Sequence, residues 1–333
     1  MKSTIPEGYQ PLLNVYETQR AISILKETLM GSLAKRLKLT RVSAPLIVPT
    51  SSEVTDQYAK TQPITFRIPA LGIDAEIVQS LNKWKRVSLA RYGFPAGEGL
   101  FTDMNAIRWD QTPDNTHSVY VDHWAWAVHI REEERSLDTL YHAVHSSVMA
   151  LCDADIRIRD IFPQLLVLPE LEREVSFVTA QELEEHYPEL SPVERENAFA
   201  RMHHTCFVRN YGTPLKDGTQ HRVRRPDTSE WPLSGRLIFW DSVLNAALPV
   251  ASIGIHVDAE SLDHQLAVMG DQSDHRYYQA IREGKIPPSI GGSMGQSRLA
   301  MLFLGKAHIG EVQIGVWDQE TRDAFEAAGI PLL

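Results

Sequence analysis

The stretch Gly291-Gly292-Ser293-Met294-Gly295-Gln296-Ser297-Arg298 runs directly into the apolar segment Leu299-Ala300-Met301-Leu302-Phe303-Leu304. This pattern predicts a glycine-rich turn that opens a buried helix. Glycine lets a ligand approach the backbone closely, and Arg298 adds a fixed cation at the helix N-terminus. Two interpretations follow: a site for phosphate or adenine, or a turn that only packs the helix.

The stretch does not fit two common nucleotide motifs. It is not a Walker loop, because no Lys-Ser/Thr pair follows the glycines. It is not a dinucleotide fingerprint either, because the spacing differs and no strand is predicted directly before it. Any nucleotide site here therefore needs partners elsewhere in the chain.

A strand, a loop and a second strand supply the next candidates. The segments 102–108 and 117–126 read as strands around the turn-forming loop 110–115, and Arg108 ends the first strand. An arginine in this position is either a site residue or part of a surface salt bridge. Alternation along the second strand puts His123 and Ala125 on one face, which predicts the floor of a pocket.

The remaining pattern indicates an α+β fold. Helical periodicity marks 16–37, 132–152, 180–186 and 192–202, whereas strands are predicted at 43–48 around Pro45, in a hairpin within 64–79, and at 165–168, 237–240 and 253–257. The elements interleave without a regular βαβ repeat. We therefore expect an antiparallel sheet flanked by helices.

Composition sets the class of protein. The 333 residues are 43% hydrophobic and 23% charged, as in ordinary globular chains, and the net charge of −10 disfavours nucleic acid as a partner. Two cysteines, Cys152 and Cys206, are too few to stabilise a chain of this size by disulfide bonds, so we expect a reducing, cytoplasmic location. No signal-peptide core or membrane-length apolar run is present. Without a repeat or linker, residues 1–333 are expected to form a single catalytic domain.

Three further clusters have plain alternatives. The segment Ser80–Arg86 combines a hydroxyl, cations and an aromatic ring, but also suits a solvated helix start. The run His203–Cys206 suggests zinc, yet adjacent histidines do not face one ion from a regular element and no second pair stands at finger spacing. The basic run His221–Arg225 is either a solvated face or a phosphate cradle.

Taken together, the segments resemble the aspartate–ammonia ligases, the ammonia-dependent asparagine synthetases of the A type. The resemblance covers nearly the whole chain and is carried by the opening helix with Ser43–Ile47, Gln79–Arg86, Ala96–Leu100, His117–Asp122, Val257–Ala259, His264–Ala267 and Ile290–Gly310. It implies the catalytic core of class II aminoacyl-tRNA synthetases. The first motif, at 16–48, implies a homodimer; Arg108 and Arg298 belong to the second and third motifs.

The resemblance also implies a reaction and its site residues. Family members bind ATP and magnesium, adenylate the side-chain carboxylate of aspartate and let ammonia displace AMP. The positions that match substrate or nucleotide contacts are Asp56, Ser80, Lys85, Arg108, Arg224, Ser252 and Arg298, with Gly291, Gly292 and Gly295 at the nucleotide. Arg108 and Arg298 would clamp the phosphates. Lys85 would add a charge at the reacting phosphorus, and Asp56 would orient the attacking amine.

Several positions depart from the family's pattern. His123 and Ala125 replace Gln and Asp, and His256 replaces Arg. These changes remove a partner for a substrate ammonium and weaken the grip on a carboxylate, so we expect aspartate to bind poorly. Ser229, Arg236 and Pro249 stand where the family has acidic residues near nucleotide and metal. The magnesium ligands are therefore undefined, and Arg236 offers a cation for phosphate instead.

Four functions follow from these observations. The first is an ATP-dependent ligase that joins a carboxylic acid other than aspartate, or an amine other than ammonia, through an adenylate. The second is ordinary aspartate–ammonia ligation with compensating substitutions. The third is a silent paralogue that only binds a nucleotide or amino acid. The fourth, a tRNA synthetase, is disfavoured because the core resemblance uses the whole chain and the net charge is negative.

Overall fold

Two long helices form one layer of the molecule. The computed structural model describes residues 3–55 and 62–333, and in it α1 (Val15–Leu37) packs against α3 (Leu137–Ile161). A capping box between Asn14 and Glu17 satisfies the first backbone amides of α1, which is worth about 1 kcal/mol. Lys38 ends the helix in the left-handed conformation. The apolar faces of both helices enter the same core.

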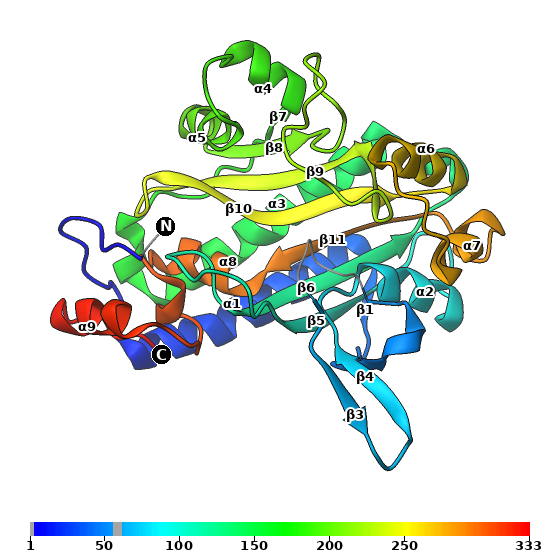
Figure 1. Cartoon of the computed structure of the whole chain (residues 1–333). Helices are drawn as coiled ribbons and strands as arrows, with labels where there is room; N and C mark the ends of the chain where they lie inside the picture. The colour runs from blue at the N-terminus through cyan, green and yellow to red at the C-terminus, as the bar shows by residue number, and fades with distance from the viewer. Residues whose placement is uncertain (1–2, 56–61) are drawn as a thin grey trace.

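An eight-stranded sheet forms the second layer, and the two helices run behind it in Figure 1. Its strand order is β1-β5-β6-β11-β10-β9-β8-β7. The strands are β1 (Leu39–Arg41), β5 (Gly99–Ile107), β6 (Tyr120–His129), β7 (Ser176–Thr179), β8 (Thr205–Arg209), β9 (Ser229–Asp241), β10 (Ala246–His256) and β11 (Ser289–Gly295). The central pairs are antiparallel, as expected, while the outer pairs β1–β5 and β7–β8 are parallel. The predicted α+β class is confirmed.

Shorter elements surround this sheet. A second sheet has the order β2-β4-β3 and extends away from the body in Figure 1. Its strands are β2 (Ile47–Pro49), β3 (Thr65–Ile68) and β4 (Ile73–Ile77). The other helices are α2 (Asn82–Tyr92), α4 (Ala180–His186), α5 (Pro192–His203), α6 (Ala259–Met269), α7 (Arg276–Arg282), α8 (Gln296–Leu304) and α9 (Gln319–Ala327). Over residues 3–55 and 62–333, no helix has the length and apolar character of a membrane span.

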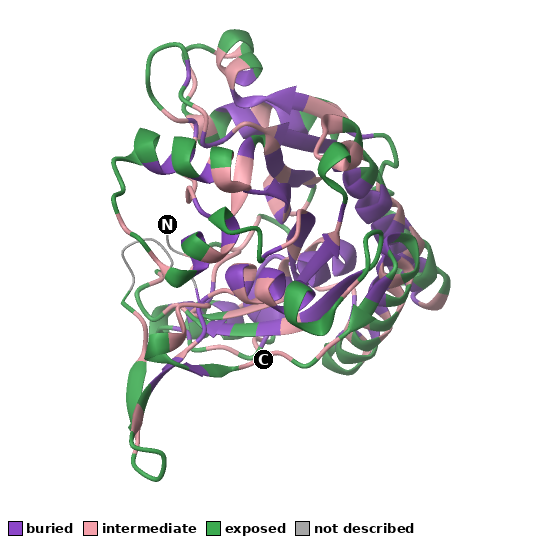
Figure 2. Ribbon diagram, turned by 90° about the vertical axis from the view of Figure 1, so that its right-hand side faces the viewer, coloured by how far each residue is buried: buried purple, intermediate pink, exposed green. Residues whose placement is uncertain are grey.

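Strand β6 separates the core from the opposite face of the sheet. Trp124 and Trp126 are buried in the same cluster as α1 and α3, while Ala125 belongs to a different cluster. This is the alternation that the sequence predicts for His123 and Ala125. Figure 2 shows buried residues along the sheet and the inner sides of the helices, with exposed residues outside. The face that carries His123 and Ala125 is thus free of the helical layer.

The prediction of a turn at the glycine-rich stretch is wrong. Residues 289–295 form the central strand β11, and α8 begins directly after it. A Cβ atom at Gly291 would lie 2.6 Å from the Trp126 carbonyl oxygen. At Gly292 it would lie 2.7 Å from the Ser252 carbonyl oxygen. The glycines are therefore needed for close packing between strands as well as for any ligand.

Other sequence expectations are corrected in detail. Pro45 lies outside any strand, and the short strand that follows it is Ile47–Pro49. Residues Pro163–Val167 form a 3₁₀ turn rather than a strand, since Pro163 starts a helical turn readily. Strands β7 and β8 were not predicted, because four or five residues give too little alternation to detect. The hairpin β3–β4 and the unit β5–loop–β6 are confirmed.

We predict that Gly292→Ala destabilises the fold by about 1 to 3 kcal/mol, because the added methyl group would overpack against the Ser252 carbonyl and the Trp126 ring. Urea denaturation measures this change. Gly31→Ala in α1 is the matched control, since a Cβ there meets nothing within 4 Å. That substitution should stabilise by about 0.5 to 1 kcal/mol. Equal midpoints for both variants would contradict the packing argument.

Candidate active site

A cavity of about 800 Å³ lies over the sheet face turned away from α1 and α3. Strands β6, β9, β10 and β11 contribute to it, together with α2 and the loop after β5. Most residues singled out in the sequence line it: Ser80, Lys85, Arg108, His123, Ala125, Arg224, Arg236, Ser252, Gly291, Gly292, Gly295 and Arg298. The fold therefore brings together positions that are more than two hundred residues apart in the chain.

Small side chains make the floor of the cavity. Strand pairing aligns Ala125 with Ser293, Ser293 with Ser252, and Ser252 with Arg236. Residues opposite one another in a sheet point to the same face. The row therefore consists of a methyl group and two hydroxyl groups, with one guanidinium at its end.

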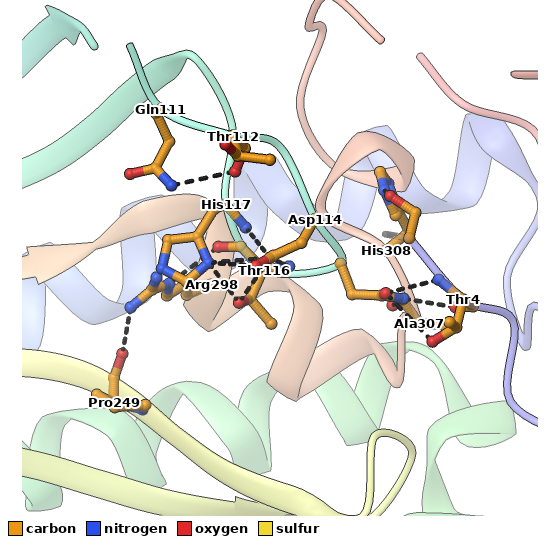
Figure 3. Close-up of polar contacts among 12 residues, drawn as sticks. Thr4, Gln111, Thr112, Asp114, Thr116, His117, Pro249, Arg298, Ala307 and His308 are labelled. Carbon is orange, nitrogen blue, oxygen red and sulfur yellow. Dashed lines mark hydrogen bonds and ion pairs between the residues drawn. The ribbon is translucent and has the colours of Figure 1, made fainter. Parts of the chain in front are cut away.

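Arg298 is held in place by two carbonyl groups from different segments. Its Nε donates to the Thr116 carbonyl oxygen at 3.1 Å, and its Nη1 donates to the Pro249 carbonyl oxygen at 3.1 Å (Figure 3). The side chain leaves the first turn of α8, directly after β11. Sheet, helix and loop thus fix one cation on the cavity wall.

The loop between β5 and β6 is organised around Asp114. Its Oδ1 accepts hydrogen bonds from the backbone amides of Thr116, at 2.8 Å, and of His117, at 2.9 Å. Burial raises the pKa of this carboxyl, but the hydrogen bonds from His117 and Thr116 outweigh it and lower the pKa to about 2. The turn therefore keeps its charged cap at neutral pH.

Asn115 ties the same loop to both ends of the chain. Its Nδ2 donates to the carbonyl oxygens of Thr4, at 2.6 Å, and of Ala307, at 2.7 Å. The Thr4 amide donates back to its Oδ1 at 2.8 Å. Figure 3 shows Thr4 and Ala307 on one side of this loop and Arg298 on the other. The loop that carries the Arg298 anchor is thus fastened on two sides.

His123 lies in the field of both motif arginines. Burial, followed by the charges of Arg108 and Arg298, lowers the pKa of its imidazole to about 3. The ring is therefore neutral at physiological pH. Arg108 follows β5, and its backbone amide donates to the Val119 carbonyl oxygen at 2.8 Å. The two arginines thus act on one ring from separate motifs.

Lys85 enters the cavity from the opposite side. It is 1% exposed, and its Nζ donates to the Gly292 carbonyl oxygen at 3.2 Å. Ser80 lies at the start of the same helix, where its Oγ accepts from the Asn82 amide at 3.2 Å. The segment Ser80–Arg86 is therefore part of the cavity wall and not a solvated helix start.

A buried ion-pair cluster beside Lys85 was not identified from the sequence. Asp227 Oδ2 lies 3.0 Å from Lys83 Nζ and 2.8 Å from Arg225 Nη2, and it accepts from the Tyr278 hydroxyl at 3.0 Å. Burial raises the pKa of Asp227, but Arg225 and Lys83 outweigh it and hold the pKa well below its usual range. The sequence does contain a signal for this cluster, because the acidic residue Asp227 follows directly after the basic run that ends at Arg225 and Pro226.

Asp122 is a second residue that sequence reasoning left unassigned. Its carboxylate accepts from the Ser297 hydroxyl at 2.8 Å and from Gln313 Nε2 at 3.1 Å. Burial raises its pKa despite these hydrogen bonds. Asp122 lines the cavity from β6, and its partner Ser297, in the first turn of α8, directly precedes Arg298. Its position favours a role in holding β6 to α8.

Arg224 and Arg236 meet over one aromatic ring. The Cζ atoms lie 5.2 Å and 5.7 Å, respectively, from the centroid of the Tyr211 ring, which is almost fully buried. Both arginines line the cavity. Part of the run His221–Arg225 therefore faces the site: Arg224 and Arg225 do so, while His221 and Arg222 bind Glu196. The cation–π contacts hold the two cations in place.

His256 stands next to the cavity but does not line it. It is fully buried, and its Nδ1 lies 2.8 Å from the Ser289 hydroxyl. A Cβ atom at Gly291 would be 2.7 Å from its Cε1, so the ring packs against that glycine. Burial, then Lys85, Arg86 and Arg135 lower its pKa well below the usual value, so the ring is neutral. Its predicted contact with substrate is thus absent from the cavity wall.

Asp56 lies outside the described residues, so its predicted role stays a prediction. The cavity carboxylates that are described are Glu53, Glu76, Asp122 and Asp271. The cations around the cavity are Lys83, Lys85, Arg108, Arg224, Arg225, Arg236 and Arg298. Positive charge therefore dominates this cavity, which suits a polyanionic ligand.

The described residues form no carboxylate cage for a magnesium ion held by the protein alone. Ser229 and Pro249 line the cavity together with Arg236, and none of them offers a carboxylate oxygen. Within residues 3–55 and 62–333, no three His, Cys, Asp or Glu side chains are grouped closely enough to hold a metal. His203 and His204 pair instead with Ser176, at 3.2 Å, and Glu172, at 2.6 Å.

Comparison with known proteins adds the family. Residues 16–329 match the family described as aspartate-ammonia ligase. The aspartate–ammonia ligase of Levilactobacillus brevis is 43% identical over 100% of both chains. That of Clostridium perfringens is 43% identical over 100% of this chain and 99% of the relative, and that of Bacillus thuringiensis is 44% identical over 97% and 99%.

Solved structures support the fold independently. The asparaginyl-tRNA synthetase of Entamoeba histolytica matches with a TM-score of 0.63 and 16% identity, over 89% of this chain and 67% of that one. That of Pyrococcus horikoshii, complexed with asparaginyl-adenylate, matches with a TM-score of 0.63 and 13% identity, over 89% and 68%. The chain therefore has a class II aminoacyl-tRNA synthetase-like core and belongs to the aspartate–ammonia ligase family of ATP-dependent ligases.

Proposed function

We propose that this protein activates a carboxylic acid with ATP and transfers the acyl group to ammonia or another amine. A carboxylate oxygen attacks the α-phosphorus of ATP, and pyrophosphate leaves. The amine nitrogen then attacks the carbonyl carbon of the acyl adenylate, AMP leaves with the bonding electron pair, and the nitrogen loses a proton. The observation that carries this proposal is that Arg108 and Arg298, from separate motifs, line the same cavity together with His123.

Preorganised cations account for the activation step. Arg298 is anchored by two carbonyl groups, so its charge does not need to be reoriented when a nucleotide binds. Arg108 provides a planar fork suited to two oxygens of a phosphate and a carboxylate. Lys85 adds a third charge from the opposite wall, held at the Gly292 carbonyl. These three residues form the proposed catalytic set, with Asp56 orienting the amine.

The acid-binding end favours a substrate other than aspartate. Ala125 carries no charge to pair with an ammonium, and neutral His123 supplies one hydrogen-bond donor and one acceptor. His256 is neutral and lies behind Gly291, so it offers no fork for a second carboxylate. Ser80 and Ser252 add hydroxyl groups. We therefore infer an acid whose far end is neutral or polar.

Aspartate–ammonia ligation is the second candidate, because relatives 43% identical over the full length carry that name. In either case we infer one cytoplasmic catalytic domain that uses small-molecule substrates and no tRNA. The homodimer expected across residues 16–48 belongs to the same proposal.

We expect the purified protein to release AMP and pyrophosphate when it is incubated with ATP, hydroxylamine and a suitable carboxylic acid. Hydroxamate formation reports the activated acyl group. Aspartate should be at least about tenfold slower than the preferred acid, the cost of roughly one lost charged contact. The panel should contain aspartate, its analogues without the amino group, and monocarboxylic acids with polar ends.

Two results would contradict this function. Fastest turnover with aspartate and ammonia would establish the second candidate instead. If no acid yields AMP or hydroxamate and the protein still binds a nucleotide measurably, only the silent paralogue remains.

Arg108→Lys should lower kcat/KM for acid activation by about a hundredfold or more, because lysine retains the charge but not the fork. Steady-state pyrophosphate release measures the change. Arg67→Gln is the control, since that arginine pairs with Asp74 on the exposed β3–β4 hairpin. Unchanged kcat/KM in Arg108→Lys would remove Arg108 from the catalytic set.

His123→Gln should make the free energy of unfolding less dependent on pH on the acid side of neutrality. A histidine with pKa about 3 when folded and about 6.5 when unfolded binds more protons in the unfolded state, so the native protein loses stability as pH falls from 6.5 towards 3. Between pH 7 and 5, the unfolding free energy of the variant should fall by about 2 kcal/mol less than that of the wild type. Urea titrations at several pH values test this, and parallel profiles would show that His123 does not resist protonation.

A further inference from the structure

Arg224 and Arg236 place two positive charges on one wall of the cavity. Each Cζ lies within contact distance of the same Tyr211 ring, at 5.2 Å and 5.7 Å from its centroid. Two positive charges held near one ring favour an anion beside them. Because Tyr211 is 1% exposed, the ring does not move aside to let the cations separate.

Two carboxylates in the segments around this wall, Glu196 and Asp227, bind other groups. Glu196 accepts from Arg222 at 2.6 Å and 2.8 Å, and from His221 at 3.1 Å. Asp227 is shared between Lys83 and Arg225. Among the residues that the structure describes, the Arg236 guanidinium forms no ion pair or hydrogen bond, only its contact with the ring. Its charge is therefore available to a ligand.

The position of Arg236 within the sheet aims it at the cavity. It lies opposite Ser252 in the β9–β10 ladder, and Ser252 lies opposite Ser293 in the β10–β11 ladder. Pro249, whose carbonyl oxygen binds Arg298, lies on the same strand β10 as Ser252. A phosphate chain that contacts Arg298 thus lies near β10, the strand paired with the strand β9 from which Arg236 projects.

This wall provides cations where a divalent ion would need oxygen ligands. Arg236 itself, Ser229 and Pro249 offer no carboxylate. Guanidinium groups bind phosphate oxygens directly, through two parallel hydrogen bonds. The charge that a metal ion would neutralise is thereby met by fixed protein groups.

We propose that Arg236, with Arg224 on the Tyr211 ring, binds the phosphate chain of ATP directly, so that nucleotide binding by this protein does not depend on a divalent cation. The inference rests on the proposed function, because it assigns the charges around the same nucleotide site. It concerns binding of the nucleotide and not the fate of the acid.

Calorimetric titration of the full chain with ATP tests the proposal. The wild-type Kd measured in EDTA should lie within about threefold of the Kd measured with excess magnesium. Arg236→Gln should weaken ATP binding in EDTA by about tenfold to a hundredfold, the range expected for losing hydrogen bonds from a charged group. The same substitution should weaken the binding of AMP, which lacks the β and γ phosphates, by no more than about threefold.

Two further variants make the result unambiguous. Arg67→Gln removes the same charge from the exposed hairpin and should leave both dissociation constants unchanged. If Arg236→Gln melts at a lower temperature than the wild type, Arg236→Lys replaces it, and an intermediate loss of ATP affinity is expected because the charge remains without the fork.

Three outcomes would overturn the proposal: ATP binding only with magnesium, unchanged ATP affinity in Arg236→Gln, or equal losses for ATP and AMP. These results are independent of the hydroxamate assay. If ATP binds without metal but no acid is turned over, this inference stands and the proposed function is wrong. If an acid is turned over but ATP binds only with metal, the proposed function stands and this inference is wrong.

Discussion

The structure depends on the close approach of β11 to its two neighbours. Gly291 and Gly292 leave no room for a Cβ atom, because the Trp126 carbonyl and ring, the Ser252 carbonyl and the His256 ring already occupy that space. Trp126 belongs to the core between sheet and helices, whereas Ser252 lies on the cavity floor. The packing of β11 therefore joins the stability of the fold to the shape of the site. The position of Arg298 depends on β11, because α8, which carries Arg298 in its first turn, begins directly after that strand.

The cavity concentrates positive charge around a neutral ring. Arg108 and Arg298 come from separate motifs, and both depress the pKa of His123. Taking positive charge out of water costs solvation energy, which a bound anion offsets. Lys83 and Arg225 line the same cavity and share the carboxylate of Asp227. The excess of cations over carboxylates among the described cavity residues therefore favours an anionic ligand.

Much of the fold could be predicted from local pattern. The long apolar repeat of α1, the capping box that starts α4 at Thr179, and the alternation of β6 are each encoded by neighbours in the sequence. The glycine-rich segment was misjudged because glycine favours turns locally, and only the Trp126 and His256 side chains, far away in the chain, require it in a strand. The same holds for the site. Residue types indicated the cations, but the Tyr211 ring under Arg224 and Arg236 depends on tertiary contacts that no spacing reveals.

The contacts of Asn115 link the beginning of the chain to the loop that positions Arg298. The Thr4 backbone donates to and accepts from the side-chain amide of Asn115, and the neighbouring Thr116 carbonyl oxygen accepts from the Arg298 guanidinium. Leu333, at the other end, donates its amide to the Gly310 carbonyl oxygen, close to the same segment. An affinity tag or fusion partner attached just upstream of Thr4 would be joined to a segment that hydrogen-bonds the loop anchoring Arg298. We therefore expect the kinetics of this protein to depend on where a purification tag is placed and whether it is removed.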